Sequence, residues 1–375
     1  MIPGLDGIRA IAMLIILNFH VGGYQFGWLT VQSFFVLSGF LITGILLRMK
    51  DSLPGKQFFT KFYGRRFLRI FPLYYFYLFI LTLLVWKSNL ILLKPLHEEI
   101  QSFVQPQLWM AYTYLFDFRY ASASFLDTPF MTHLWTLSVE EQFYLLWPVI
   151  LFLTPKEKLK TLFLSMIVFA PIFRLAVYLA VSNHLLLPFA DDPYRAIYAM
   201  PFSHLDGFAF GAYITTFKFS NPRKQLAILA IVLPLAGYLT QYLTYGSVAW
   251  DTFGYEFNMV SGYKFVWGYT VTNYFFAVFI QAVYREGLFV RFLHHPVLQY
   301  LGKISYGLYV YHFPIIFFLL LLRPKYKMLF PPQVEFLFLF LSAMILTILA
   351  ASLSYHVLEK PLNNLKDKFF PLRAE

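Results

Sequence analysis

The sequence predicts an all-α polytopic membrane protein, a bundle of about ten transmembrane helices with both termini in the cytoplasm. Of its 375 residues, 59% are hydrophobic and 21% aromatic, whereas only 13% are charged, and the mean hydropathy is +0.60. A helix needs about 20 mostly apolar residues to cross the hydrocarbon core of a bilayer, and the chain contains about ten such runs. Basic residues collect in alternate links between these runs, which is typical of a multi-pass protein.

The length of each apolar run and the charges or Pro and Gly breaks beside it define ten predicted spans. They are residues 8–24, 30–47, 70–87, 134–153, 161–182, 200–217, 226–243, 265–284, 304–322 and 334–354. The link 48–69 carries the densest basic cluster, so the positive-inside rule assigns it to the cytoplasm. Alternation then assigns the other basic links and both termini to the same side.

Composition and motifs exclude several classes of function. The chain has no cysteine, which excludes disulfides, thiolate metal sites and a cysteine-bound acyl intermediate. The net charge of +11 follows the links and forms no single stripe, so we expect the lipid bilayer and no nucleic acid as a partner. No H-E-x-x-H, P-loop or GxGxxG motif is present, so no metal site is predicted. No repeat or long soluble link divides the chain, and we expect residues 1–375 to form one transmembrane domain.

The first span keeps two polar side chains, Arg9 near its start and His20 near its end. They are eleven residues apart, about three helical turns, so they share one helix face and lie roughly 16 Å apart along the axis. Arg9 is predicted near the cytoplasmic boundary and His20 toward the outer side. A charged group within a membrane usually faces a polar cavity or a partner, which indicates function. The alternative is an arginine that reaches lipid phosphates and a histidine that only packs.

A second group of basic residues, Arg65, Arg66 and Arg69, lies at the predicted start of the third span. Spacings of three and four residues place Arg69 on the same helix side as the other two. The dipole at a helix start favours anions and therefore does not explain these arginines. Guanidinium groups form paired hydrogen bonds with phosphates, which suits a nucleotide-bearing cofactor or a lipid headgroup. Positive-inside topology alone is the alternative.

The fourth span begins with HLWTLSVEEQFYLLWP, residues 133–148, which contains two adjacent glutamates. Glu140 and Glu141 point about 100° apart on a helix, so we expect at most one of them to face a given cavity. A carboxylate near a histidine stabilises the imidazolium form, so either glutamate is a candidate partner for an imidazole. Interfacial carboxylates that face water are the alternative.

Weaker candidates lie elsewhere along the chain. His312 in the ninth span and Asp206 in the sixth could line a cavity, or each could be a buried polar group satisfied by a neighbouring helix. An aromatic outer region would suit stacking on a sugar ring, although interfacial aromatic belts have the same composition. Its residues are Trp109, Tyr112, Tyr114 and Trp135.

Five motifs together resemble the acyltransferase-3 family of integral membrane O-acyltransferases. They are LDGIRAIAMLIILNFH, FFVLSGFLIT, FYGRRFLRIFPLYY, HLWTLSVEEQFYLLWP and ISYGLYVYHFPI. The similarity extends from Leu5 to the closing YHVLEKPL, and the arginine and histidine of the first span are a specific marker in combination with the other motifs. His204 stands where many members have an arginine, so the sixth-span motif FSHLDGFAFGA receives no role.

The resemblance implies transfer of an acyl group, usually acetyl, from cytoplasmic acyl-CoA to a hydroxyl of an extracytoplasmic glycan or lipid-linked sugar, without a permanently bound cofactor. It implies that His20 is catalytic. It also implies that the CoA phosphates contact Arg9, Arg65, Arg66 and Arg69. A minority of members acylate small molecules, and some carry an SGNH esterase-like domain that this chain is expected to lack. The implied location is the plasma (inner) membrane of a bacterium.

We therefore predict a membrane O-acetyltransferase in which His20 is the general base and Glu140 or Glu141 holds the imidazolium that forms. A two-step route through acyl-His20 is the rival mechanism. The alternative function is a secondary transporter or flippase for an anionic or glycolipid substrate, although internal repeats and matched broken helices are not found. A third alternative, a structural scaffold protein, would not explain why Arg9, His20 and the arginine cluster occur together.

Overall fold

The computed structural model describes residues 3–90, 94–185, 192–326 and 330–372, and within these residues the regular structure is helical throughout. The helices at the ten predicted positions are α1 (Leu5–His20), α2 (Thr30–Ser52), α3 (Gly55–Lys87), α7 (Trp135–Leu153), α8 (Leu159–Ser182), α10 (Leu205–Thr216), α11 (Pro222–Tyr245), α12 (Lys264–Glu286), α15 (Ser305–Tyr326) and α16 (Pro332–Ser354). Shorter helices connect them: α4 (His97–Glu99), α5 (Leu108–Tyr112), α6 (Phe116–Ala121), α9 (Pro193–Ala199), α13 (Val290–Leu293) and α14 (Pro296–Lys303). A further helix, α17 (Lys360–Phe369), follows α16.

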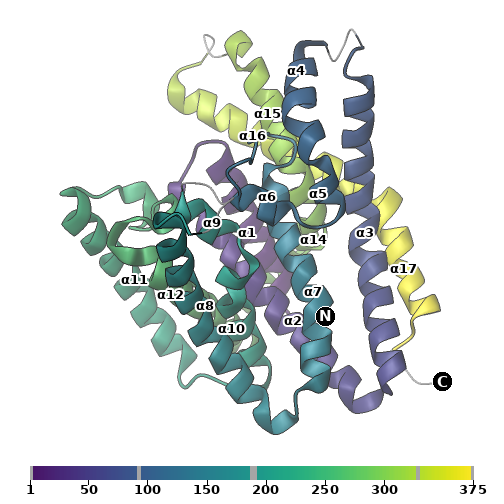
Figure 1. Ribbon diagram of the computed structural model, residues 1–375, viewed down its shortest axis with the longest axis vertical. Helices are drawn as coiled ribbons and strands as arrows, with labels where there is room; N and C mark the ends of the chain where they lie inside the picture. The colour runs from purple at the N-terminus through teal and green to yellow at the C-terminus, as the bar shows by residue number, and fades with distance from the viewer. Residues whose placement is uncertain (1–2, 91–93, 186–191, 327–329, 373–375) are drawn as a thin grey trace.

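Helices α1 and α2 lie in the middle of the molecule (Figure 1). Helices α8, α10, α11 and α12 form a group on one side of them, and α3 with α17 stands on the other side. Helices α15 and α16 pack together at the upper end of the view. The central position of α1 explains why its polar side chains face protein and a cavity and not lipid.

The all-helical class is confirmed, but the count of ten membrane spans is not. Among the residues that the structure describes, six segments are long and apolar enough to cross a membrane, and the pair α14 and α15, bent by 74°, would make a seventh. The six are Gln25–Ser52, Gly55–Lys87, Thr132–Leu153, Lys156–Ser182, Pro222–Tyr245 and Pro332–Phe369. Helix α1 has only 16 residues and α10 only 12, and α10 buries eight of these. Such short helices can lie inside a bundle because neighbouring helices, not lipid, cover their sides.

The third span begins earlier than predicted. Helix α3 runs for 33 residues from Gly55, so Arg65, Arg66 and Arg69 lie within it and not at its start. The stretch before Arg65 contains no proline, and its Lys and Gln residues are good helix formers, so the basic segment continues the helix. The argument from the helix dipole at these arginines was therefore wrong.

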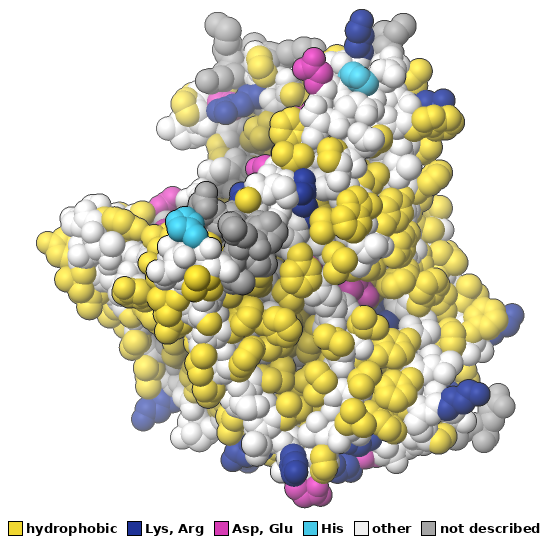
Figure 2. Space-filling view, in the orientation of Figure 1, with side chains coloured by type: hydrophobic (Ala, Val, Ile, Leu, Met, Phe, Trp, Pro, Cys, Tyr) yellow, Lys and Arg dark blue, Asp and Glu magenta, His cyan; other side chains and the backbone are white. Residues whose placement is uncertain are grey.

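Basic links gather at one end of the molecule. The links from α2 to α3 and from α7 to α8 lie at the lower end of Figure 1. Several Lys and Arg side chains appear at that end in Figure 2, below a surface rich in hydrophobic side chains. This separation is what the positive-inside rule expects of a cytoplasmic end, and the cytoplasmic orientation of both termini stays a prediction.

Two glycines allow α2 and α10 to pack backbone against backbone. A Cβ atom at Gly39 of α2 would lie 2.0 Å from the main-chain oxygen of Phe208, and one at Gly211 of α10 would lie 2.0 Å from that of Val36. No side chain fits at either distance. Small residues at a helix contact of this kind permit the close approach that stabilises helix pairs in membranes.

Replacing Gly39 with alanine is expected to destabilise the protein by about 1–3 kcal/mol, because the new methyl group forces the two backbones apart. This loss of stability is expected even though alanine has a higher helix propensity than glycine. Gly44→Ala on the same helix is the matched control, since its Cβ would meet side chains and no backbone, a Thr215 methyl group at 3.2 Å and the end of the Arg48 side chain at 3.5 Å. Thermal unfolding in detergent measures both variants, and equal midpoints would contradict the prediction.

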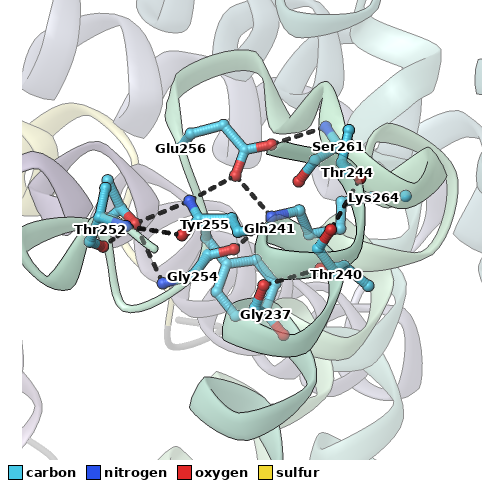
Figure 3. A network of polar contacts seen from close by, with 12 residues as sticks. Gly237, Thr240, Gln241, Thr244, Thr252, Gly254, Tyr255, Glu256, Ser261 and Lys264 are labelled. Atoms are coloured by element: carbon cyan, nitrogen blue, oxygen red, sulfur yellow. Dashed lines mark hydrogen bonds and ion pairs between the residues drawn. The ribbon is translucent and has the colours of Figure 1, made fainter. Parts of the chain in front are cut away.

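The link between α11 and α12 is held by a polar network around Glu256 (Figure 3). The fully buried Lys264 donates to Glu256 at 2.5 Å and also to the carbonyl of Gly254. Gln241 and the main-chain N–H of Ser261 donate to the same carboxylate at 2.9 and 2.7 Å. Burial alone would raise the pKa of Glu256, but these hydrogen bonds lower it below its ordinary value. The carboxylate is therefore held in its charged form.

This link also covers the end of α1. Phe257 packs against Phe19, with ring centroids 6.3 Å apart, and Phe253 packs against Phe26 at 4.4 Å. Phe19 directly precedes His20 in the chain. The network in Figure 3 thus holds the link whose Phe257 packs on the residue before the predicted catalytic histidine.

Candidate active site

A cavity of about 1000 Å³ lies inside the bundle, with walls formed by parts of α1, α2, α3, α7, α10, α12, α14 and α15 and by the segment from Tyr355 to Asn363. Six basic side chains and four carboxylates line it, so its formal charge is positive. The basic residues are Arg9, Arg48, Arg66, Arg69, Lys303 and Lys360, and the carboxylates are Asp6, Glu140, Glu141 and Glu359. Such a lining suits an anionic ligand that extends into an aromatic interior.

The structure brings Arg9, Arg66 and Arg69 to this one cavity from two helices that are distant in the sequence. Arg9 forms an ion pair with Asp6, one helical turn away, at 2.7 Å. The guanidinium of Arg66 lies over the ring of Tyr144, 5.2 Å from its centroid. Within the described residues neither Arg66 nor Arg69 is paired with a carboxylate, so both can bind an anion in the cavity.

Arg65 is placed elsewhere. It does not line the cavity, and it forms an ion pair with Asp367 of α17 at 2.8 Å. It also donates to the main-chain oxygens of Phe370 and Lys366. Arg65 therefore attaches the C-terminal helix to α3, and the three arginines predicted as one group divide into two sets.

Both glutamates line the cavity, so the expectation that only one could face it was wrong. The cavity is wide enough to contact both side chains, although they leave the helix in directions about 100° apart. Glu140 accepts hydrogen bonds from Ser38 at 3.0 Å and from Tyr144 at 3.3 Å. Glu141 has an oxygen that is buried without a hydrogen-bond partner. Within the described residues no hydrogen bond joins either glutamate to His20, so the predicted direct pairing is absent.

His20 belongs instead to a cluster of three histidines. Its ring lies 5.2 Å from that of His312, and the His312 ring lies 5.5 Å from that of His133. Phe313 packs against both His20 and His133, at 4.8 and 5.3 Å. His133 and His312 are buried, whereas His20 is half-buried. His20 is therefore the member of the cluster that a substrate can approach.

Tyr309 and Thr136 stand between the cavity and the three histidines. Both line the cavity, and their hydroxyl oxygens are 2.5 Å apart. The Tyr309 hydroxyl donates to the main-chain oxygen of His133 at 2.9 Å, and its ring lies 5.3 Å from that of His312. His20 itself is not among the residues that line the cavity. A chain that enters past the arginines would reach this hydroxyl pair before it reaches His20.

Asp206, a weaker sequence candidate, is not part of the cavity. It forms an ion pair with Arg174 of α8 at 2.9 Å, and both side chains are fully buried. Thr270 and Asn273 of α12 donate to the same carboxylate. The group therefore satisfies a buried charge and joins α8, α10 and α12, which is the structural alternative that the sequence left open.

The aromatic outer region is only partly exposed. Trp109 is 57% exposed, whereas Trp135 and Tyr114 are buried. Tyr114 stacks on Tyr74 with ring centroids 4.3 Å apart, and Trp135 packs on Tyr198 at 4.5 Å. These two side chains belong to the core, so the predicted sugar-stacking surface of four aromatic residues was wrong in this respect.

Sequence reasoning did not single out His133 and Tyr309, although both lie in motifs that it quoted. His133 precedes the fourth span, and Tyr309 is three residues before His312. Spacing places Tyr309 and His312 on one face of a helix. No pattern within a single segment predicts that His133 would meet them from another helix.

Comparison with known proteins gives the same assignment over nearly the whole chain. The family described as "Acyltransferase domain" matches residues 2–352. The O-acetyltransferase OatA of Staphylococcus aureus (strain NCTC 8325) is 27% identical over 381 residues, which cover 98% of this chain and 58% of that protein. A second S. aureus protein (strain COL), whose name gives O-acetyltransferase as a provisional assignment, is 28% identical over 96% of this chain and 57% of its own length.

This chain thus spans less than two thirds of the curated relatives that it matches. The comparison with solved structures found no match. The family match covers the first-span arginine and histidine, the arginines of α3, the two glutamates and His312. On that match, the chain belongs to the acyltransferase-3 family.

Proposed function

We propose that this protein is a membrane O-acetyltransferase that moves an acyl group from cytoplasmic acyl-CoA to a hydroxyl of a cell-surface or lipid-linked glycan. The observation that carries the proposal is that Arg9, Arg66 and Arg69 line one internal cavity in a chain of this family. The OatA relatives are named O-acetyltransferases, which supports acetyl as the group and oxygen as its acceptor.

The donor is supported by the charge and shape of the cavity. Guanidinium groups bind phosphates through paired hydrogen bonds, and CoA carries several phosphates on its nucleotide end. The lining of the cavity includes the arginines as well as Tyr309, Thr136 and many apolar and aromatic side chains. A thioester carried on an extended arm would lie among these apolar side chains and be kept from water.

His20 supplies the base in the proposed reaction. The acceptor hydroxyl loses its proton to His20 while its oxygen attacks the thioester carbonyl carbon. The carbon–oxygen bond forms and the carbon–sulfur bond breaks, and the thiolate of CoA leaves and takes up the proton. In the rival two-step route, His20 first takes the acyl group from the thioester and then passes it to the acceptor hydroxyl. Acylated His20 that accumulates without acceptor, detected by mass spectrometry, would identify that route.

The test is turnover of radiolabelled acetyl-CoA by the protein in liposomes, together with equilibrium binding of acetyl-CoA. Arg66→Gln is expected to weaken binding about 10-fold to 100-fold, because hydrogen bonds to charged groups contribute about 1.5–3 kcal/mol. Arg291→Gln, an exposed arginine outside the cavity, is the matched control and should bind as wild type does.

Two outcomes would overturn the proposal. The first is wild-type protein that neither binds nor consumes acetyl-CoA in the presence of candidate glycans. The second is a glycan or glycolipid that crosses the membrane with unchanged mass, which would favour the transporter. Equal binding by Arg66→Gln and Arg291→Gln would remove Arg66 from the donor site.

A further inference from the structure

We propose that His312 and His133 are positioning residues for His20, and that their two free ring nitrogens are the acceptors between which His20 shares the one N–H that points away from the substrate. This inference rests on the proposed function and deepens it by naming the groups that support the base. It replaces the glutamate that the sequence suggested for this role.

The tautomer of His312 follows from its hydrogen bond. Nδ1 of His312 lies 2.6 Å from the main-chain oxygen of Tyr309. A carbonyl oxygen only accepts, so Nδ1 must carry the hydrogen and donate it. In the neutral ring Nε2 then holds a lone pair, and this nitrogen is buried without a hydrogen-bond partner in the described part of the chain.

His133 has the opposite arrangement. Its Nε2 lies 3.1 Å from the main-chain oxygen of Val310, so Nε2 carries the hydrogen. Its Nδ1 is the free nitrogen, and this atom is also buried with no partner among the described residues. The two carbonyls of neighbouring residues on α15 thus set both tautomers and leave two basic nitrogens in one cluster.

These nitrogens need a donor, and His20 is placed to supply it. Two lone pairs cannot bond to each other, and a buried acceptor without a partner costs about 1–3 kcal/mol. The ring of His20 is 5.2 Å from that of His312, which a small ring rotation can close to a hydrogen bond. A donor N–H from His20 on this side leaves its second nitrogen as the base that faces the substrate.

The described residues offer no other role for the cluster. No group of three His, Asp, Glu or Cys side chains among them has the geometry of a metal site. No carboxylate is hydrogen-bonded to any of the three rings in that part of the chain. In this arrangement the imidazolium formed during acyl transfer has neutral imidazoles, and no carboxylate, beside it.

Reciprocal amide substitutions test the proposal. In His312→Gln the amide oxygen can reach the position of Nε2, whereas in His312→Asn the amide N–H keeps the bond to the Tyr309 carbonyl and the Nε2 acceptor is lost. We expect His312→Asn to lower kcat about 100-fold and His312→Gln to lower it less, with acetyl-CoA binding unchanged.

At His133 the expected order is reversed. His133→Asn can place its oxygen at the position of Nδ1, whereas His133→Gln keeps the bond to the Val310 carbonyl and loses the acceptor. We therefore expect Asn to retain more activity than Gln at position 133. A purely structural role, in which only the backbone hydrogen bond matters, predicts the opposite order at both positions and would overturn the proposal.

A second measurement does not depend on turnover. Diethyl pyrocarbonate acylates neutral imidazole nitrogens, and peptide mass spectrometry gives its rate at His20 alone. Loss of the acceptor in His312→Asn should slow this reaction several-fold relative to His312→Gln, whereas simple loosening of the fold would speed it. A rate of His20 modification in His312→Asn that is unchanged or faster would overturn this inference. If the modification slows as expected but the wild-type protein shows no acetyl-CoA turnover, only the proposed function is overturned.

Discussion

Replacement of His20 with alanine is expected to lower acyl transfer about 10³-fold, because a general base contributes roughly 10²–10⁴ to the rate. Acetyl-CoA binding should stay close to wild type, since His20 does not line the cavity that contains the arginines. Turnover of labelled acetyl-CoA and equilibrium binding measure the two effects separately.

The matched control is His294→Ala, which removes an exposed histidine from the link before α14. This variant should keep both binding and turnover. Activity of His20→Ala within a few-fold of wild type would show that His20 is not the base. Loss of binding together with turnover would instead place His20 in the fold or in the donor site.

The second large effect is expected on stability, at the buried pair of Arg174 and Asp206. Asp206→Ala should lower the free energy of unfolding by about 3–5 kcal/mol, because it leaves an arginine buried without its counter-charge. Arg174 would keep its hydrogen bonds to Ser203 and Val266 but lose its carboxylate. Thermal or denaturant unfolding in detergent measures this loss.

Two comparisons separate burial from charge in this experiment. Asp51→Ala removes an exposed ion pair with Lys156 and should cost about 0–1 kcal/mol. The double variant Arg174→Met/Asp206→Leu replaces both charges with apolar groups and should recover much of the stability lost by Asp206→Ala. A double variant as unstable as the single one would contradict this account.

The sequence was sufficient where one segment contains the whole signal. The spacing of Arg9 and His20 requires only a continuous helix, and α1 includes both residues. The apolar runs placed a helix at every predicted position because hydrophobicity and length are local properties. The count of spans was less secure, since whether lipid or protein covers a helix depends on its neighbours.

Contacts between residues of different segments could not be predicted in this way. Arg65 and Arg66 are adjacent, yet one contacts α17 and the other lines the cavity, because they point in different directions on α3. His133 and His312 come together only when the short turn before α7, Thr132–Leu134, packs on α15. The sequence could not show for the same reason that Glu140 bonds Ser38 and Tyr144 and not His20, because helical geometry gives the direction of a side chain but not the side chain that it faces.

The contact between α2 and α10 also sets a time order for assembly. Gly39 meets Phe208, and these residues are separated by 208 − 39 = 169 positions in the chain. At about 5–20 residues per second, a ribosome reaches α10 roughly 10–30 s after it has made α2. Over that interval the glycine face of α2 lacks its partner on α10, and the cavity, whose wall α2 helps to form, is completed only when the later segments that line it, among them α14 and α15, have also been made.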